Sequence, residues 1–366
     1  MKIVVFGLTI SSSWGNGHAT LWRGLCRGLA KIGHHVVFYE RDVPYYAGAR
    51  DLHEIAGGEL ILYPDWDSIQ HRAKRDVADA DVAMVTSYCP DAAVATDLVT
   101  DRSRLSVFYD LDTPITLMRL RRGEAVDYIG PRGLADFDLV LSYTGGIALD
   151  ELRSRLRARR VAPLYGHVDP AVHRPADPVE HYRADLSYLG TYAADRQAAL
   201  EALFINPARR RPERRFLMGG AQYPTDFPWS ENVFFVRHLP PSEHPAFFSS
   251  SRMTLNVTRR EMADMGWCPS GRLFEAAACG TPVLSDVWEG LDQFFTPDRE
   301  ILLARNTDAA VAALDLLDAE IKRIGQAARE RTLAEHTSGC RALELVAILE
   351  NVRARRSDEK LSLVEA

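Results

Sequence analysis

The stretch SGRLFEAAACGTPVLSD, residues 270–286, carries the residue types best suited to chemistry. Ser270 can serve as the N-cap of a short helix, and the glycine and proline at 280–282 end that helix before an apolar strand. A helix that begins with serine, glycine and arginine offers backbone N–H groups, a hydroxyl and a guanidinium to a diphosphate. Glu275, one turn along, could accept hydrogen bonds from the two adjacent hydroxyls of a ribose. These features predict a nucleotide diphosphate site, although AAACG is also typical of a small-residue helix packed on a sheet.

A second candidate site is the loop SSSWGNGH, residues 11–18. Gly15 and Gly17 permit a tight turn and the close approach of another molecule to the backbone. A helix beginning near His18 presents unpaired N–H groups and a positive dipole end, which favour anions and a neutral imidazole that can accept a proton. Two interpretations stay open, His18 as a catalytic base and His18 as a residue that only caps or packs.

Asp110 and Asp112 form a D-x-D pair after another apolar run. Such a pair can hold Mg²⁺ or Mn²⁺ against a diphosphate. Asp112 could instead orient His18, as the acid of a catalytic triad does, or the segment could be a turn that caps the next helix. We favour an acid that faces the site over a metal ligand. The 11–18 loop is no dinucleotide fingerprint, because Thr20 stands where G-x-G-x-x-G requires glycine.

Short apolar runs alternate along the chain with longer helical patterns. Runs rich in Val, Ile, Leu and aromatic residues predict strands buried on both faces of a parallel sheet. Apolar residues three or four apart predict a helix over 18–32, and further helices are predicted from about 308 to about 355. The predicted strands are 2–6, 35–39, 60–63, 82–86, 105–109, 139–142, 186–189, 215–218, 233–236, 253–257, 283–285 and 301–303.

Three prolines in YGHVDPAVHRPADP separate the two sets of predicted strands. Proline excludes a helix interior or a central strand, so we interpret this segment as a connector. The predicted domains are 1–166 and 183–340, joined by the connector over 167–182 and followed by a C-terminal helix and polar tail over 341–366. Strand–helix alternation in both domains predicts two doubly wound α/β folds with a ligand cleft between them.

The composition narrows the class of protein. The 366 residues include 44 Lys and Arg against 50 Asp and Glu, a net charge of −6, which argues against a dedicated nucleic-acid binder. Five dispersed cysteines without a C-x-x-C pair indicate reduced thiols. No run approaches the ~18 apolar residues of a membrane span, and the first ten residues read better as a strand than as a signal peptide. We therefore expect a soluble, cytoplasmic protein.

GRLFEAAACGTPVLSD resembles the nucleotide-sugar signature of GT-B glycosyltransferases, especially those of the CgeB-like, spore-maturation-protein branch. LSYLGTYAADRQAAL resembles the opening of their C-terminal domain, HVDPAVHRP their connector, SDVWEGLDQFFTPDREILLA the acidic turn after the signature, and GNGHAT their acceptor loop. The resemblance spans about residues 1–304. It implies a GT-B fold of two Rossmann-like domains that face a central cleft, and a nucleotide-sugar donor with no permanently bound cofactor or metal.

The resemblance also implies roles for individual residues. The implied donor-binding set is Gly190, Thr191 and Arg196 at the phosphates, the backbone of His238 and Leu239 at the base, Arg259 or Arg260 at the leaving diphosphate, Ser270, Gly271, Arg272 and Glu275 at the diphosphate and ribose, and Asp286 and Glu289 at the sugar hydroxyls. The implied acceptor-side set is Trp14, Gly15, Asn16, Gly17, His18 and Asp110. The two arginines at 259 and 260 are equally typical of a solvated loop.

Charge predicts how such a site would act. Cleavage of the sugar–phosphate bond builds negative charge on the diphosphate, so Arg272 would be the main preorganised counter-charge. His18, with Asp112, would be the base of an inverting enzyme and mainly a binding residue in a retaining one. Many retaining members carry E-x₇-E, but Trp267 stands at the first acidic position here. The stereochemical course therefore stays open.

The sequence predicts a glycosyltransferase of the hexosyltransferase class. It would move a sugar from a UDP-, GDP- or dTDP-sugar to a hydroxyl of a saccharide, a glycolipid precursor or a natural product. A GT-B-fold sugar-nucleotide epimerase and a catalytically silent scaffold that binds a sugar or a partner are the alternatives. No nucleic-acid partner is expected, and the sequence does not indicate an oligomeric state.

Overall fold

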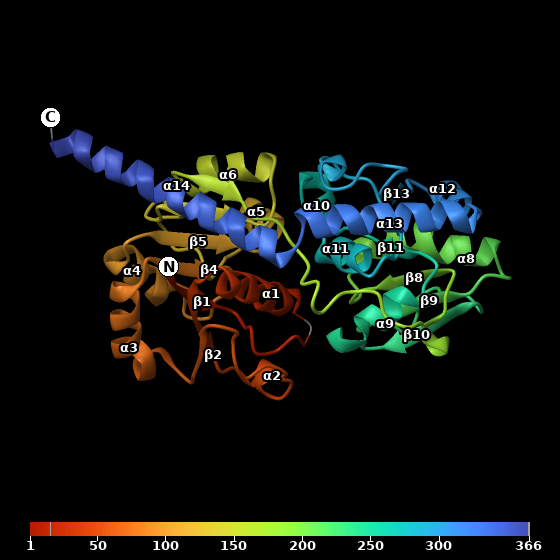
Figure 1. Cartoon of the computed structure of the whole chain (residues 1–366), viewed down its shortest axis with the longest axis horizontal. Helices are drawn as coiled ribbons and strands as arrows, with labels where there is room; N and C mark the ends of the chain where they lie inside the picture. The colour runs from red at the N-terminus through yellow and green to blue at the C-terminus, as the bar shows by residue number, and fades with distance from the viewer. Residues whose placement is uncertain (15, 365–366) are drawn as a thin grey trace. The chain divides into compact units, whose positions relative to one another are not determined.

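The computed structural model describes residues 1–14 and 16–364, with side chains as far as Arg356. The chain divides into two compact units (Figure 1). The first comprises residues 1–165 and the C-terminal segment from Ser338, and the second comprises residues 166–337. Each unit is built around one parallel sheet. No helix among the described residues is long and apolar enough to cross a membrane.

The first unit contains a seven-stranded parallel sheet in the order β3-β2-β1-β4-β5-β6-β7. Its strands are β1 (Lys2–Gly7), β2 (His35–Arg41), β3 (Glu59–Tyr63), β4 (Val82–Thr86), β5 (Ser106–Asp110), β6 (Leu139–Ser142) and β7 (Val161–Pro163). Val4 of the central strand pairs with Val37 on one side and Ala83 on the other. β1, β4, β5 and β6 are almost wholly buried, as expected of parallel strands covered by helices on both faces.

Helices connect these strands and cover the sheet. They are α1 (Gly17–Lys31), α2 (Pro44–Ala47), α3 (Trp66–Asp79), α4 (Ala92–Arg102), α5 (Thr113–Arg121), α6 (Ile147–Leu156) and α14 (Ser338–Val364). Leu21, Leu25 and Leu29 bury one face of α1, which confirms the helix predicted over 18–32. The C-terminal helix α14 packs against α1. Gly28 permits this contact, because a Cβ there would lie 2.5 Å from the Ser338 carbonyl oxygen.

The second unit contains a six-stranded parallel sheet in the order β10-β9-β8-β11-β12-β13. Its strands are β8 (Leu186–Leu189), β9 (Phe216–Gly220), β10 (Val233–Arg237), β11 (Thr254–Asn256), β12 (Val283–Ser285) and β13 (Leu302–Leu303). Its helices include α7 (Gln197–Leu200), α8 (Asn206–Arg210), α9 (His244–Ser249), α10 (Arg260–Met265), α11 (Gly271–Ala278), α12 (Thr307–Leu314) and α13 (Asp318–Glu335). Both sheets reverse direction of winding next to their first strand, the order typical of doubly wound folds.

The observed units differ from the predicted domains at two places. The segment predicted as a connector over 167–182 belongs to the second unit, where His173 is buried and Val168 forms a bridge with Thr337. The C-terminal helix predicted as a separate segment belongs to the first unit and runs as a helix to Val364, through the predicted polar tail. Strand β7 was also not predicted, because it is three residues long and ends in Pro163.

Candidate functional site

In the first unit, the loop between β1 and α1 is held by a buried carboxylate. Glu40, at the end of β2, is 1% exposed and accepts hydrogen bonds from the hydroxyl of Thr9 (2.8 Å) and the backbone N–H of Ile10 (2.8 Å). It also accepts both the N–H (2.9 Å) and the hydroxyl (2.6 Å) of Ser11. These bonds are charge-assisted and buried, so they fix the path of the loop that leads to His18. No sequence motif marks this role.

His18 lies in the first turn of α1 beside Asp112. Asn16 is the N-cap, and its side-chain oxygen accepts the His18 N–H at 3.0 Å. His18 Nε2 lies 3.6 Å from the Asp112 carboxylate, beyond hydrogen-bond distance but within reach of an ion pair. His18 Nδ1 is buried without a partner among the described residues. The structure therefore brings these two residues together through Nε2, whereas a catalytic triad would use one nitrogen for the acid and the other for the proton.

Asp110 is the last residue of β5 and is completely buried. One carboxylate oxygen accepts the Asp112 N–H at 3.0 Å, and the other has no partner among the described residues. Burial raises the pKa of Asp110 to about 6. A buried carboxyl that stays partly protonated near neutral pH is typical of functional sites.

Two tyrosines complete this region. Tyr88 follows β4 with a φ of 63°, a left-handed conformation that costs energy for a tyrosine. Its ring centroid lies 5.9 Å from that of His18 and 5.0 Å from that of Tyr128. The sequence analysis missed both tyrosines, because neither backbone strain nor ring contacts can be read from a motif. Of the predicted acceptor-side residues, Gly15 lies outside the described residues, and Trp14 is 41% exposed.

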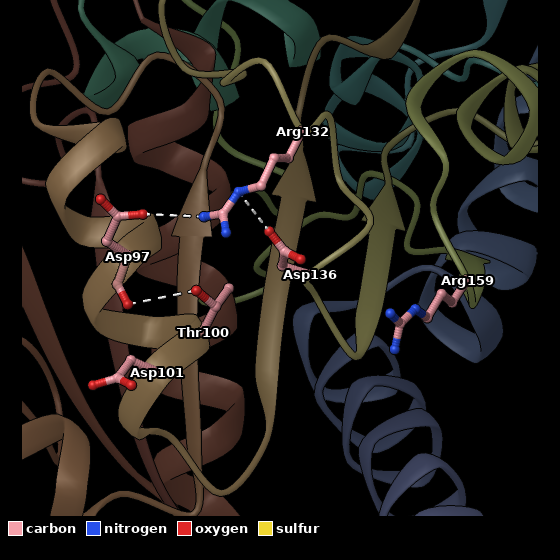
Figure 2. A pocket seen from close by; sticks show the side chains of 6 residues that line it. All are labelled: Asp97, Thr100, Asp101, Arg132, Asp136 and Arg159. Atoms are coloured by element: carbon pink, nitrogen blue, oxygen red, sulfur yellow. Dashed lines mark hydrogen bonds and ion pairs between the residues drawn. The ribbon is translucent and has the colours of Figure 1, made fainter.

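A hollow of about 520 Å³ lies elsewhere on the first unit (Figure 2). Arg132 bridges two acids there, with N–O distances of 3.3 Å to Asp97 and 3.0 Å to Asp136. Arg132 and Asp136 precede β6, and Arg159 precedes β7. The hollow therefore lies toward the amino ends of these strands, whereas His18 follows the carboxyl end of β1. It does not belong to the candidate site.

In the second unit, α11 begins as predicted. Ser270 is its N-cap, and the hydroxyl oxygen accepts the Arg272 N–H at 3.3 Å. Arg272 and Glu275 are three residues apart on the helix, and their side chains form an ion pair with an N–O distance of 2.8 Å. The predicted diphosphate-binding cation and the predicted ribose-binding acid therefore lie within direct contact.

Two histidines that the sequence analysis missed surround this pair. His173 Nε2 lies 4.0 Å and His244 Nδ1 lies 3.9 Å from the same Glu275 oxygen. Burial lowers the pKa of His244 to about 3 and also lowers that of His173, and the Arg272 cation reinforces both shifts. Burial alone would raise the pKa of Glu275, but the Arg272 cation outweighs it, and that pKa is lowered to about 2. Near neutral pH the cluster thus holds one carboxylate, one guanidinium and two neutral imidazoles.

The spacing of His173, His244 and Glu275 is compatible with a metal ion, because their ligand atoms lie within 4.8 Å of one another. However, an Arg272 nitrogen already lies 2.8 Å from the Glu275 carboxylate and 3.5 Å from His244 Nδ1. A divalent ion would have to displace this guanidinium. The arrangement therefore fits an anion-binding arginine held by an acid better than it fits a metal centre.

The loop after β8 contains Gly190, Thr191 and Arg196. A Cβ on Gly190 would lie 2.7 Å from the Tyr188 hydroxyl, so a larger residue would displace the tyrosine ring. Arg196 donates to the Thr191 carbonyl at 3.2 Å, and its Nε is buried without a partner among the described residues. These residues share the carboxyl edge of the sheet with His238, which follows β10 with a φ of 53° and donates its N–H to the Gly220 carbonyl at 2.8 Å. Leu239 is buried.

The remaining predicted donor residues differ in how accessible they are. Arg259 immediately precedes α10 and forms an ion pair with Asp195 at 3.2 Å. The Asp286 carboxylate accepts the N–H and the hydroxyl of Thr258, both at 3.0 Å, so it ties the loop after β11 to the end of β12. Glu289 is exposed.

Trp267, the residue at the missing acidic position, has a φ of 43° and donates its N–H to the Glu289 carbonyl at 2.7 Å. Its ring packs so closely on Gly290 that a Cβ there would lie 2.4 Å from the indole nitrogen. An aromatic ring thus occupies the place of the first acid.

Comparisons with known proteins agree with the fold. Residues 196–347 match the model of a family described as glycosyl transferase-like. No curated protein matches the chain.

Several solved structures have a similar fold. Sucrose-phosphate synthase from Thermosynechococcus elongatus has a TM-score of 0.68 and 14% identity, covering 97% of this chain and 99% of that one. HepE from Anabaena in complex with UDP-glucose has a TM-score of 0.65 and 12% identity, covering 96% and 100%. An alpha-glucosyltransferase in complex with UDP-glucose and DNA containing an abasic site has a TM-score of 0.69 and 14% identity, covering 96% and 99%.

These structures are similar to nearly the whole of this chain, which contains two parallel Rossmann-like sheets. The chain therefore has the GT-B fold of glycosyltransferases, and its residues 196–347 are similar to the glycosyl transferase-like family.

Proposed function

We propose that this protein is a nucleotide-sugar-dependent glycosyltransferase whose donor binds at the start of α11. The observation that carries the proposal is the Arg272–Glu275 pair, a guanidinium at the start of a helix and a carboxylate kept ionised one turn along. The positive dipole end of the helix and the guanidinium suit a diphosphate, and the ionised acid suits two ribose hydroxyls. Donor binding would loosen the ion pair and give each side chain its own ligand.

UDP-sugar is the donor that the comparisons favour, since HepE and the alpha-glucosyltransferase were both solved with UDP-glucose. A hexosyl donor and membership of the CgeB-like branch are part of the proposal, and GDP- and dTDP-sugars remain alternatives to UDP. We propose that Arg272, rather than a divalent ion, stabilises the charge that develops on the leaving diphosphate.

On the acceptor side, we propose His18 as the base. Nε2 would take the proton from the acceptor hydroxyl, because Nδ1 is buried, and Asp112 at 3.6 Å would stabilise the resulting imidazolium. Tyr88, next to the imidazole, would line the acceptor site. The acceptor is a hydroxyl compound whose identity is open. Because the alpha-glucosyltransferase was solved with DNA, DNA belongs among the acceptors to be tested, although the net charge of −6 argues against it.

A thermal-shift screen with UDP-, GDP-, dTDP- and CDP-sugars tests donor binding. A ligand at a hundred times its Kd stabilises the folded state by about 2.7 kcal/mol. The Arg272→Met variant should lose this shift, whereas Arg305→Met, which changes an exposed arginine of the same unit, should keep it. Loss in both variants, or in neither, would contradict the assignment of the site.

Product analysis then separates the proposed activity from its alternatives. A transferase releases nucleoside diphosphate slowly from the donor alone and faster with an acceptor. An epimerase interconverts two sugar nucleotides, and a silent scaffold leaves the bound donor intact. Either of the last two results would replace the proposal.

A further inference from the structure

The edge strand β10 exposes more aromatic surface than its position in a soluble fold requires. It lies at the end of the second sheet and pairs only with β9 among the described strands (Figure 1). Phe234 is 43% exposed on one face of the strand and Phe235 is 40% exposed on the other. Trp229, with a ring centroid 5.2 Å from that of Phe235, extends the apolar surface. Exposed aromatic surface along the open edge of a sheet is typical of an interaction site.

The other sheet edges in the described part of the chain are better protected. β13 has only two residues, and β7 ends in Pro163. β3 starts with the charged residue Glu59, although it exposes Leu62. Short strands, proline and charge are the usual devices that prevent edge-to-edge pairing. From Val233 to Val236, β10 carries none of them.

The backbone of β10 is ready to accept another strand. The Asn232 carbonyl accepts the Phe216 N–H at 3.0 Å, and the His238 N–H donates to the Gly220 carbonyl at 2.8 Å. The backbone N–H and C=O groups of the even-numbered residues therefore point toward β9. Because strand residues alternate, Val233, Phe235 and Arg237 direct their N–H and C=O groups to the open edge. The Val233 N–H is used by the Ser230 carbonyl at 2.9 Å. The edge therefore offers two donors, from Phe235 and Arg237.

We propose that β10 pairs antiparallel with β10 of a second copy of this chain, with the two-fold axis at Phe234. In this register Val233 lies opposite Phe235 of the second copy, and Glu231 lies opposite Arg237 of the second copy. The Phe235 N–H would bond to the Val233 carbonyl of the second copy and the Arg237 N–H to its Glu231 carbonyl, each bond being formed twice by symmetry. The occupant is a second copy because the strand is complementary to itself in charge, with an acid at one end and a base at the other.

The two-fold register also explains the exposed aromatic residues. Each Phe234 would face its symmetry mate at a non-hydrogen-bonded position, where side chains come closest. Arg215, whose guanidinium carbon lies 3.7 Å from the Phe234 ring centroid, would cover this contact. Val233 and Phe235 would form the apolar centre of the opposite face, flanked by the two Glu231–Arg237 pairs. The proposal does not depend on the proposed enzymatic activity.

Sedimentation equilibrium over a wide range of protein concentrations tests the dimer. The wild-type chain should dimerise, and Phe234→Lys should weaken the dimer at least tenfold because it places two ammonium groups opposite each other. Leu62→Lys is the matched control: it adds the same charge at an exposed apolar residue, 37% exposed, on edge strand β3. It should leave the dimer unchanged. A monomeric wild-type chain, or a dimer that only Leu62→Lys disrupts, would overturn the proposal.

A charge exchange tests the register. Glu231→Arg and Arg237→Glu should each weaken the dimer, because each places like charges opposite one another, and the double variant should restore it. Both residues are exposed, so the fold should survive, which circular dichroism can verify. A double variant as weak as the single variants would overturn this pairing.

Discussion

Ionisation of the buried Asp110 carboxyl should lower the free energy of unfolding of the first unit at neutral pH. Its folded-state pKa, raised by burial to about 6, lies above the ordinary value of 3.8. The protonated form is therefore the one that the fold prefers. The resulting stabilisation is fully present below about pH 3.8 and is lost as the pH rises to about 6. This interval corresponds to about 3 kcal/mol, since one pH unit is equivalent to about 1.4 kcal/mol.

The Asp110→Asn variant removes this dependence, because asparagine stays neutral and keeps an oxygen to accept the Asp112 N–H. The stability difference between the variant and the wild-type protein should therefore move by about 3 kcal/mol in favour of the variant between pH 3 and pH 7. For a unit of this size that corresponds to a rise of about 6–12 °C in relative melting temperature.

Differential scanning calorimetry at several pH values between 3 and 8 measures the effect. The control is Asp127→Asn, which neutralises an exposed carboxyl of the same unit and should give a constant difference. If the stability difference between Asp110→Asn and the wild-type protein does not change with pH, the pKa of Asp110 is not raised and the reasoning is refuted.

Three further substitutions test other parts of the structure. Glu40→Gln should lower stability by about 2–4 kcal/mol in calorimetry, because the amide cannot accept all the bonds that fix the loop, and an unchanged melting temperature would contradict this. Gly220→Ala would place a Cβ 2.0 Å from the Gly190 carbonyl oxygen, so it should shift the loop after β8. Donor binding measured by titration calorimetry should weaken at least tenfold. An unchanged affinity would refute this reasoning. Arg272→Met should destabilise the second unit by about 2–4 kcal/mol, because it leaves the buried Glu275 carboxylate unpaired. Adding Glu275→Gln should recover part of this loss. Additive effects of the two substitutions would show that the two residues are not coupled.

Much of the fold could be predicted because parallel strands are buried on both faces and appear as continuous apolar runs. The twelve predicted strands all lie on strands of the two sheets, to within two residues at their ends. The helix α14 was predicted from its pattern, but its packing on α1 was not. That contact depends on the close approach at Gly28, which no local pattern reveals.

The candidate site divides in the same way. The Ser270 cap was predicted, because a cap depends on residues within one turn of a helix. Arg272 and Glu275 were predicted only as separate ligand-binding residues, and their (i, i+3) ion pair was found in the structure. His173 and His244 could not be predicted, because they come from distant segments and meet Glu275 only in the folded unit. The strain at Tyr88 likewise comes from its backbone conformation, which its residue type does not favour.

The most direct test of the central claim is the rate of nucleoside diphosphate release from the sugar nucleotide that stabilises the protein most. The wild-type protein should release it slowly without acceptor and faster with one. Arg272→Met should reduce turnover by about 10²–10³-fold, as expected for the loss of one preorganised counter-charge, and His18→Ala should slow transfer to the acceptor. Rates unchanged in both variants would contradict the account.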